Sequence, residues 1–454
     1  MTVFDRKRLT NDVFKLDVER MRRGWYSDKY FENIGAMLTQ LAADGYHYSG
    51  QAPSLPGVDL NRVAVGDLEV EMQWFTRRPG ATVVVGVDKA VEMLRHCTGY
   101  FEGEKFISTW EQMEKVEAVH DGECVQYNGD PMRVQPVIRV RGRYRDFALL
   151  ETPTLGILTR ASRVATNVYN TLIAARGKPV LFFPARFDLH EVQAADGYAY
   201  NVAIQRFNQD YAPVRAKHTS PLQALVSTDA QGDWWGGAGG GTVAHAAIAC
   251  FFGDTAETML AFCYTRPPHI PRIALVDFNN DCAGDSLATL EAMFPRYREL
   301  MDAGDETEAR KFVLYGVRLD TGGSVRDESV PPLGDPALDL GVNPRLVFNV
   351  REALNNAWTR WNVPPAWQER AKEYCRTVKI VVSGGFNPEK IKRFEKLGVP
   401  VDIYAVGSSL FDNHGDTVTD FTADVVRVKV DGAWRDMAKI GRAPCENPDL
   451  ERVV

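Results

Sequence analysis

The sequence lacks the features that mark secreted, zinc-binding and membrane-spanning proteins. Its seven cysteines are scattered and form no C-x-x-C pair, and its eight histidines show no H-x-H or H-x-x-x-H spacing. These patterns disfavour a disulfide framework and a zinc site, and they fit a reducing cytosol. No apolar run approaches the roughly 18 residues of a membrane helix, and the polar start MTVFDRKRL predicts no signal peptide. We therefore expect a soluble, cytoplasmic protein with no membrane partner.

Positive charge is not in excess either. The chain has 53 Lys and Arg against 60 Asp and Glu, which gives a formal net charge of -7. A nucleic-acid-binding surface over the whole protein is therefore disfavoured, whereas a local basic pocket for phosphates remains compatible with this balance. The composition, 45% hydrophobic and 25% charged, is ordinary for a globular protein, and 454 residues fit two or three domains.

The order of apolar segments predicts an α/β protein with an added α+β layer. Residues 1–45 have helical periodicity, and the alternation in 60–80 and 114–150 predicts strands, so residues 1–150 form an α+β domain. From residue 151 to 415, short apolar strands alternate with helices, which favours an irregular (β/α) barrel over an open parallel sheet. The expected strands are KPVLFF, QALVST, GTVAHA, RIALVDF, FVLYGVRLD, VKIVV and VDIYAV. Residues 416–454 alternate again and are expected to rejoin the N-terminal domain.

Polar residues follow each expected barrel strand, at the end where barrel enzymes carry their chemistry. They are Phe183 to Arg186, Ser227 to Asp229, Asp277, Arg318 and Asp320, Ser383 to Gly385, and Gly407 to Ser409. SGGF and VGSSL can seat a phosphate on exposed backbone N–H groups, although tight βα turns need glycine as well. Asp277, Asp320 and Arg318 can hold ribose hydroxyls and a magnesium pyrophosphate group; a structural salt bridge and a helix cap are the alternative.

The segment GGAGGGTVAH, residues 236–245, concentrates five glycines just before His245. A flexible linker, a close approach of the backbone to a ligand, and a moving loop are the possible reasons. A dinucleotide fingerprint is disfavoured because no strand precedes the glycines, and a P-loop is disfavoured because no Gly-Lys-Ser/Thr follows. A loop that delivers His245 to a phosphate-rich rim remains, as does a buried histidine with only structural contacts.

Taken together, these motifs resemble the nicotinate phosphoribosyltransferase family and its nicotinamide-using relatives. SDKYF at 27–31 is similar to the family's T-D-x-Y, and ETPTLGILTRASRVATN at 151–167 to its E-x-P-L-L helix. FFPARF resembles F-G-x-R-R, GTVAHA resembles G-T-x-A-H-S, and VRLDTGGS resembles R-L-D-S-G-D-L. SGGF and VGSSL resemble S-G-G-L and V-G-T-x-L. The resemblance spans nearly the whole chain in the family's order.

The resemblance implies an ATP-coupled, ligase-type phosphoribosyltransferase of NAD biosynthesis that works as a homodimer with Mg²⁺. It would join nicotinate to phosphoribosyl pyrophosphate, giving nicotinate mononucleotide and pyrophosphate. His245 stands at the family's phosphorylated position. The implied pyridine contacts are Phe183, Arg186 and Tyr30, the last from the partner subunit. Asp277 and Asp320 would hold ribose and magnesium pyrophosphate, with Arg318 beside them. The implied 5′-phosphate seat consists of Ser383, Gly384, Gly385, Gly407 and Ser408.

Two positions depart from the family pattern. Phe187 replaces an arginine, and Asp229 stands where nicotinate-using members carry serine and nicotinamide-using members carry aspartate. A carboxylate facing a carboxylate is unfavourable unless a cation intervenes, for which Lys217 and His218 are the candidates. A nicotinamide phosphoribosyltransferase is therefore the alternative function, and an inactive ligand-binding paralogue is the second. A quinolinate-using enzyme is disfavoured because such chains are shorter and lack the histidine motif.

Overall fold

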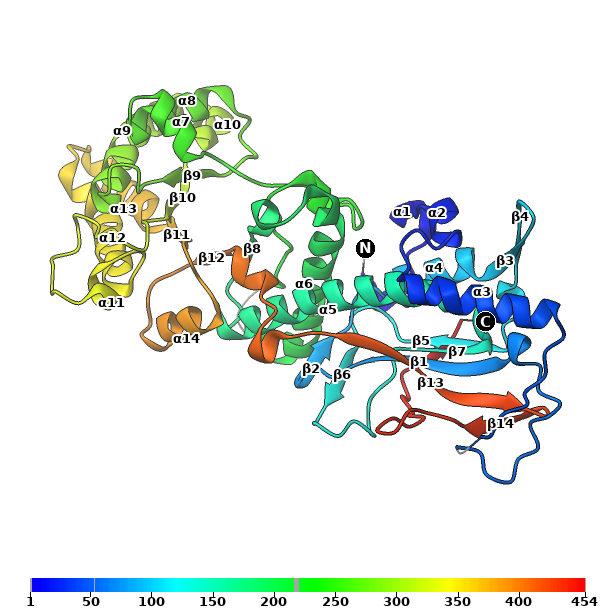
Figure 1. Cartoon of the computed structure of the whole chain (residues 1–454). Coiled ribbons are helices and arrows are strands. Elements are labelled where there is room, and N and C mark those ends of the chain that lie inside the picture. Colours follow the sequence, from blue (N-terminus) through cyan, green and yellow to red (C-terminus); the bar gives the residue numbers. More distant parts are fainter. Residues whose placement is uncertain (1, 53, 216–219, 454) are drawn as a thin grey trace. The chain divides into compact units, whose positions relative to one another are not determined.

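The computed structural model describes residues 2–52, 54–215 and 220–453 (Figure 1). The chain forms two compact units, which are described separately. Unit 1 comprises Met1–Tyr169, Ala194–Val214 and Asp412–Val454, and unit 2 comprises Asn170–Gln193 and Arg215–Phe411. The domain boundaries expected from the sequence were 150 and 415. In the structure, residues 151–169 and 194–214 group with unit 1.

Unit 1 contains a six-stranded sheet in the order β14-β13-β1-β7-β5-β15. Its strands are β1 (Glu69–Thr76), β5 (Lys115–Ala118), β7 (Ile138–Arg143), β13 (Phe421–Val430), β14 (Ala433–Asp436) and β15 (Glu451–Arg452). The C-terminal strand β13 pairs with β1 along its length, so the C-terminal segment rejoins the N-terminal α+β layer as expected. Two antiparallel two-stranded sheets pair β2 (Gly80–Val83) with β6 (Cys124–Tyr127) and β3 (Gly99–Glu102) with β4 (Lys105–Ser108).

The helices of unit 1 include several that share an apolar core with this sheet. They are α1 (Asn11–Phe14), α2 (Val18–Arg22), α3 (Lys29–Ala43), α4 (Val87–Cys97), α5 (Glu151–Ala174) and α6 (Gln193–Arg215), the last two continuing beyond the unit. Val91 and Leu94 of α4 and Leu158 of α5 share one core cluster with Trp74 and Val140 of the sheet. Gly86 starts α4 at φ +99°, where a Cβ would lie 3.0 Å from the Ile157 carbonyl oxygen, so only glycine fits this junction.

Unit 2 contains a parallel five-stranded sheet in the order β8-β12-β11-β10-β9. The strands are β8 (Val180–Phe182), β9 (Arg272–Leu275), β10 (Leu314–Leu319), β11 (Lys379–Val382) and β12 (Ile403–Val406). All four pairings are parallel, as the continuous apolar runs predicted. The helices are α7 (His245–Cys250), α8 (Thr255–Thr265), α9 (Cys282–Asp302), α10 (Glu306–Ala309), α11 (Pro336–Asp339), α12 (Pro344–Asn356), α13 (Gln368–Arg376) and α14 (Pro388–Lys396).

The side of the barrel between β8 and β9 is irregular. Two predicted strands are wrong here: QALVST contributes one isolated bridge, between Phe182 and Val226, and GTVAHA forms no strand. Instead, the Gly240 N–H donates to the Val226 carbonyl (2.8 Å), and the Thr242 hydroxyl donates to the Ile273 carbonyl (3.0 Å). These bonds link the segment 226–242 from the β8 side to β9. The expected irregular (β/α) barrel is confirmed, with single hydrogen bonds in place of two ladders.

The glycine cluster has a packing role in this segment. A Cβ at Gly239 would lie 2.7 Å from the Thr228 backbone, and one at Gly237 would lie 2.2 Å from the Trp235 ring. The Gly239 contact is with backbone atoms, so this position requires glycine, whereas a side chain at Gly237 would require the Trp235 ring to shift. This packing against the chain itself is a further reason for the glycines, beside the linker, the close approach to a ligand and the moving loop considered from the sequence.

Candidate active site

A cavity of about 360 Å³ in unit 2 lies at the ends of the parallel strands, and we name it the rim pocket. It is lined by Phe183, Arg186, Phe187, Ala244, His245, Arg318, Asp320, Ser383, Gly384, Gly385, Phe386, Ala405, Gly407 and Ser408. Most of these residues directly follow β8, β10, β11 and β12. Since the carboxyl ends of parallel strands meet at one edge, four separate stretches of sequence converge on one cavity.

The turn after β11 exposes backbone donors. Gly384 and Gly385 adopt φ +85° and φ +68°, and a Cβ at Gly385 would meet nothing within 4 Å. Within the described residues, the N–H groups of Gly384 and Gly385 have no hydrogen-bond partner. The turn leads into α14, whose N-cap is Asn387. Unpartnered N–H groups beside a helix N-terminus make this turn suited to an anion.

The serine of the turn holds a carboxylate of the neighbouring strand. Ser383 is 6% exposed; its hydroxyl donates to Asp320 Oδ1 at 2.7 Å, and its N–H donates to the Leu319 carbonyl at 2.9 Å. Arg318 Nη2 lies 3.8 Å from Asp320 Oδ2, and the Arg318 guanidinium lies 5.7 Å from the centroid of the Phe183 ring. Asp320 is thus fixed from two sides while it lines the rim pocket.

His245 begins α7 and faces a carboxylate from the end of β9. Its Nε2 lies 3.0 Å from both oxygens of Asp277. The Asp277 side chain is 8% exposed, whereas the His245 side chain is 44% exposed and lines the pocket. Burial raises the pKa of Asp277, and the negative charge of Asp320 raises it further, while His245 acts in the opposite direction. Asp277 therefore orients the imidazole and leaves Nδ1 without a partner among the described residues.

Phe187, where the family pattern has arginine, fills part of the pocket. A Cβ at Gly407 would lie 2.6 Å from Phe187 Cε2, so the ring packs directly on the Gly407 backbone. The Arg186 guanidinium lies 5.2 Å from the centroid of the same ring. This corner of the pocket therefore has an apolar wall and one arginine, with Phe183 beside it.

Three of the predicted site residues do not line the rim pocket. Asp277 reaches it only through His245. Asp229 begins a short 3-10 helix, Asp229–Gly232, and its Oδ1 accepts a hydrogen bond from the Gly239 N–H at 2.9 Å. Tyr30 belongs to unit 1, where it is 60% exposed and its hydroxyl donates to Asp28 Oδ2 at 3.2 Å. The cations proposed to compensate Asp229, Lys217 and His218, lie outside the described residues.

Some lining residues were missed by sequence reasoning. Ala244, Phe386 and Ala405 contribute apolar wall, and none of them differs in type from ordinary core residues. Phe386 could have been predicted from the sequence, because it directly follows the SGG turn.

The turn at Thr228 is stabilised by a capping box with Gln231, a short-range pattern that is also visible in the sequence.

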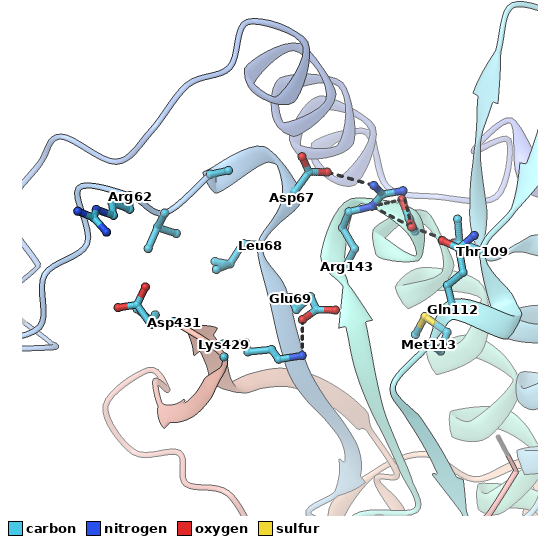
Figure 2. A pocket seen from close by; sticks show the side chains of 15 residues that line it. Arg62, Asp67, Leu68, Glu69, Thr109, Gln112, Met113, Arg143, Lys429 and Asp431 are labelled. Atoms are coloured by element: carbon cyan, nitrogen blue, oxygen red, sulfur yellow. Dashed lines mark hydrogen bonds and ion pairs between the residues drawn. The ribbon is translucent and has the colours of Figure 1, made fainter.

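A larger cavity, of about 550 Å³, lies in unit 1 (Figure 2). Most of its charges are matched among themselves: Arg143 Nε lies 3.0 Å from the Asp146 carboxylate, and Lys429 Nζ lies 2.8 Å from Glu69. Two other charged lining residues, Arg62 and Asp431, have no ion pair among the described residues. The Thr109 hydroxyl also donates to Asp146, at 2.8 Å. The groups that Figure 2 draws with dashed lines are thus partners of one another. We name this cavity the unit 1 cavity.

Metal-binding groups are sparse. In the described ranges, no three His, Cys, Asp or Glu side chains are grouped so that they could hold a metal ion. Asp277 and Asp320 are two carboxylates at the rim, close enough for one to raise the pKa of the other. Such a pair fits Mg²⁺ only where substrate phosphates supply further ligands, which is how Mg²⁺ is commonly bound. Among the described helices, none is long and apolar enough to cross a membrane.

With the parallel sheet and the rim pocket described, the chain can be compared with known proteins. Residues 58–162 match the family model described as quinolinate phosphoribosyl transferase, N-terminal domain. This match supports, over residues 58–162, the resemblance to pyridine phosphoribosyltransferases that the sequence motifs indicated. None of the curated protein sequences matches the chain.

A solved structure shares this fold. Nicotinate-nucleotide pyrophosphorylase from Pyrococcus furiosus is similar with a TM-score of 0.60 and 22% identity, over 94% of this chain and 80% of that one. Human nicotinic acid phosphoribosyltransferase gives a TM-score of 0.49 and 16% identity, over 89% of this chain and 75% of that one. At these identities the likeness concerns the fold, and the chemistry has to be argued from the rim pocket.

Proposed function

We propose that this chain is a pyridine phosphoribosyltransferase of NAD biosynthesis that joins nicotinate to phosphoribosyl pyrophosphate. The products are nicotinate mononucleotide and pyrophosphate. The observation that carries the proposal is the rim pocket, in which unpartnered N–H groups, the Asp320 carboxylate and His245 converge within about 360 Å³. A substrate with a phosphate at one end and a diphosphate at the other matches that distribution of groups.

Each part of the pocket has a distinct role in this proposal. Gly384 and Gly385, with Ser383, Gly407 and Ser408, seat the 5′-phosphate through backbone donors. Asp320 binds ribose hydroxyls and tolerates the positive charge that develops on the ribose ring as its bond to pyrophosphate breaks. Arg318 stabilises the negative charge of the departing pyrophosphate. Mg²⁺, held by Asp277, Asp320 and the diphosphate, supplies Lewis-acid stabilisation of the same charge when it is bound.

The pyridine binds between aromatic and cationic groups. Phe183 provides one face, and Tyr30 of the partner subunit provides the other in a homodimer. Arg186 pairs with the nicotinate carboxylate, a charge-assisted contact that a neutral amide cannot match. The apolar ring of Phe187 restricts the space next to Arg186.

His245 couples ATP hydrolysis to the transfer in this proposal. Asp277 binds Nε2, which leaves Nδ1 as the nitrogen able to take the γ-phosphoryl group of ATP. ADP leaves, and a proton is released from the imidazole. Phosphohistidine would add negative charge at the rim, and Mg²⁺, if bound there, would offset part of it. Hydrolysis of this group by water after transfer resets the enzyme.

Nicotinamide is the second candidate substrate, favoured by Asp229. A carboxylate beside the base would accept the amide N–H and repel nicotinate. In the structure, Asp229 Oδ1 accepts the Gly239 N–H and the residue does not line the rim pocket, which favours nicotinate. An Asp229→Ser variant should therefore leave the substrate preference within about threefold. A larger shift toward nicotinate would show that Asp229 faces the base.

The test is a product assay with nicotinate, nicotinamide and quinolinate side by side, each with phosphoribosyl pyrophosphate and with or without ATP. We expect nicotinate mononucleotide as the main product, formed faster with ATP. Formation of nicotinamide mononucleotide alone would establish the alternative. Carbon dioxide release from quinolinate would identify the activity that the matched domain family's description names. If no product forms with any of the three bases, the remaining alternative is an inactive ligand-binding paralogue.

A further inference from the structure

Lys390 lies one turn into α14, behind the turn formed by Ser383, Gly384 and Gly385. Its ammonium donates to the Gly384 carbonyl at 3.3 Å and lies 4.2 Å from the centroid of the Phe386 ring. Gly384 and Phe386 both line the rim pocket. Lys390 is thus in contact with two pocket residues while it is not itself part of the pocket wall.

This ammonium is incompletely satisfied. A lysine ammonium has three donors, and the carbonyl of Gly384 is the one hydrogen-bond acceptor that the described residues provide for it. Two aromatic rings, Phe386 and Phe394, supply the other close contacts. Burial lowers the pKa of Lys390 to about 8, with a smaller contribution from Arg393.

Among the described residues, no lysine or arginine lines the phosphate end of the rim pocket. The basic lining residues are Arg186, which follows β8, Arg318, which lies in β10, and His245, which begins α7. The strands β11 and β12, whose ends carry the glycine turns, contribute serine, glycine, phenylalanine and alanine to the described lining. Lys390 is therefore the cation nearest in sequence and contact to the donors that would hold a phosphate.

We propose that Lys390 binds the phosphate monoester at the ribose 5′ end of the substrate, moving its ammonium from the Gly384 carbonyl to a phosphate oxygen. The inference rests on the proposed function and adds a side-chain cation to a seat otherwise made of backbone N–H groups. A bound dianion satisfies the free donors and favours the charged form of the lysine. The diphosphate end of the substrate does not depend on this residue.

The test uses calorimetric titration of the full-length protein with two probes, ribose 5-phosphate and inorganic pyrophosphate. The variants are Lys390→Gln and Lys390→Arg, and the control is Lys392→Gln, an exposed lysine on the same helix. We expect Lys390→Gln to weaken ribose 5-phosphate binding by about tenfold, which corresponds to about 1.4 kcal/mol. Lys390→Arg and Lys392→Gln should stay within about threefold of the wild type, and pyrophosphate binding should change in none of them.

A pH series provides a readout that a structural role would not give. The charged groups at this corner are Arg393 on α14 and Asp320, whose Oδ1 would lie 3.5 Å from a Cβ at Gly384. Lysine is charged below its pKa, so wild-type affinity for ribose 5-phosphate should fall as the pH rises above about 8. The arginine variant should keep its affinity there. If Lys390→Gln fails to fold, the pH dependence of the wild type and of Lys390→Arg still tests the role of Lys390.

The outcomes separate the inference from the proposed function. Equal binding of ribose 5-phosphate by the wild type and Lys390→Gln, with no difference in pH dependence, would overturn the role of Lys390 and leave the proposed function standing. Absence of binding of both probes to the wild type would instead overturn the proposed function, and the role of Lys390 with it.

Discussion

The unit 1 cavity and the rim pocket are both lined by charged residues, and they differ in how those charges are matched. Around the unit 1 cavity, Arg143 is paired with Asp146 and Lys429 with Glu69. Around the rim pocket, glycine N–H groups lack partners among the described residues, and His245 is half exposed with one nitrogen held by Asp277. The larger cavity is thus mostly matched in charge, with Arg62 and Asp431 as exceptions among the described residues, and the smaller one presents unpartnered donors.

This contrast shows why cavity volume alone is a poor guide to function. Paired side chains in a groove stabilise the fold around them, and a ligand would have to break those pairs. The unpartnered N–H groups of Gly384 and Gly385 belong to exposed residues, so a ligand can bind them without breaking an existing contact among the described residues. The predictions below test this difference by comparing variants of rim-pocket residues with control variants elsewhere.

The largest effect is expected for Asp320→Asn. The change removes the carboxylate that Ser383 positions in the rim pocket, and we expect kcat/KM to fall by about 10²–10³-fold. The matched control is Asp431→Asn in the unit 1 cavity, where an exposed carboxylate is also lost. Steady-state kinetics with phosphoribosyl pyrophosphate should show no change for the control. Normal kinetics in Asp320→Asn would remove this residue from the substrate site.

Gly385→Val should have the next largest effect, a rise of about 10–100-fold in KM for phosphoribosyl pyrophosphate. The branched side chain would occupy the open space over the turn, and it would adopt φ +68°, which costs roughly 1–2 kcal/mol for a non-glycine residue. Gly398→Val is the control, because Gly398 has φ +64° and open space but lies at the other end of α14. Both variants should lose similar stability in denaturant melts. Equal KM values in the two would show that strain alone explains the effect.

His245→Ala should abolish the stimulation by ATP while ATP-independent transfer persists. Acid-labile phosphate should appear on the wild type after incubation with ATP and be absent from the variant. Asp277→Asn keeps the imidazole but loses the carboxylate that orients it, so partial stimulation is expected. If His245→Ala were stimulated by ATP as strongly as the wild type, phosphorylation would have to occur elsewhere.

Most of the rim-pocket residues could be predicted from the sequence, but the structure of the segment between β8 and β9 could not. The runs ending at Phe182, Leu319, Val382 and Val406 predicted strands because both faces of each are buried, and polar residues after them fell on one edge. The strand expected at GTVAHA did not form, since the glycines pack on the 228–232 turn and single bonds replace a ladder. Lys390 was not predictable, because its meaning depends on contacts with Gly384 and Phe386 that only the folded turn creates.

The smallest effect is expected for Glu151→Gln in unit 1. This prediction concerns the pH dependence of thermal stability and not the rim pocket. Burial raises the pKa of Glu151 to about 8, and Asp424 and Asp28 add to this shift. Because the folded state holds the proton on Glu151 more tightly than the unfolded state, the carboxyl group's stabilising contribution is fully present below its unfolded-state pKa. This contribution is lost as the pH rises toward the folded-state pKa of about 8. Glu151→Gln should therefore gain about 3 °C in Tm relative to the wild type between pH 5 and pH 8. Parallel melting curves at all pH values would contradict this assignment.

The most direct measurement is a crystal structure of the protein with phosphoribosyl pyrophosphate bound. The central claim is that unmatched donors in the rim pocket, and not the larger volume of the unit 1 cavity, mark the substrate site. We predict density for the 5′-phosphate on the Gly384–Gly385 and Gly407–Ser408 turns, with the diphosphate toward His245 and Asp277. Density for the ligand between Arg143 and Lys429 in the unit 1 cavity, with an empty rim pocket, would contradict the claim.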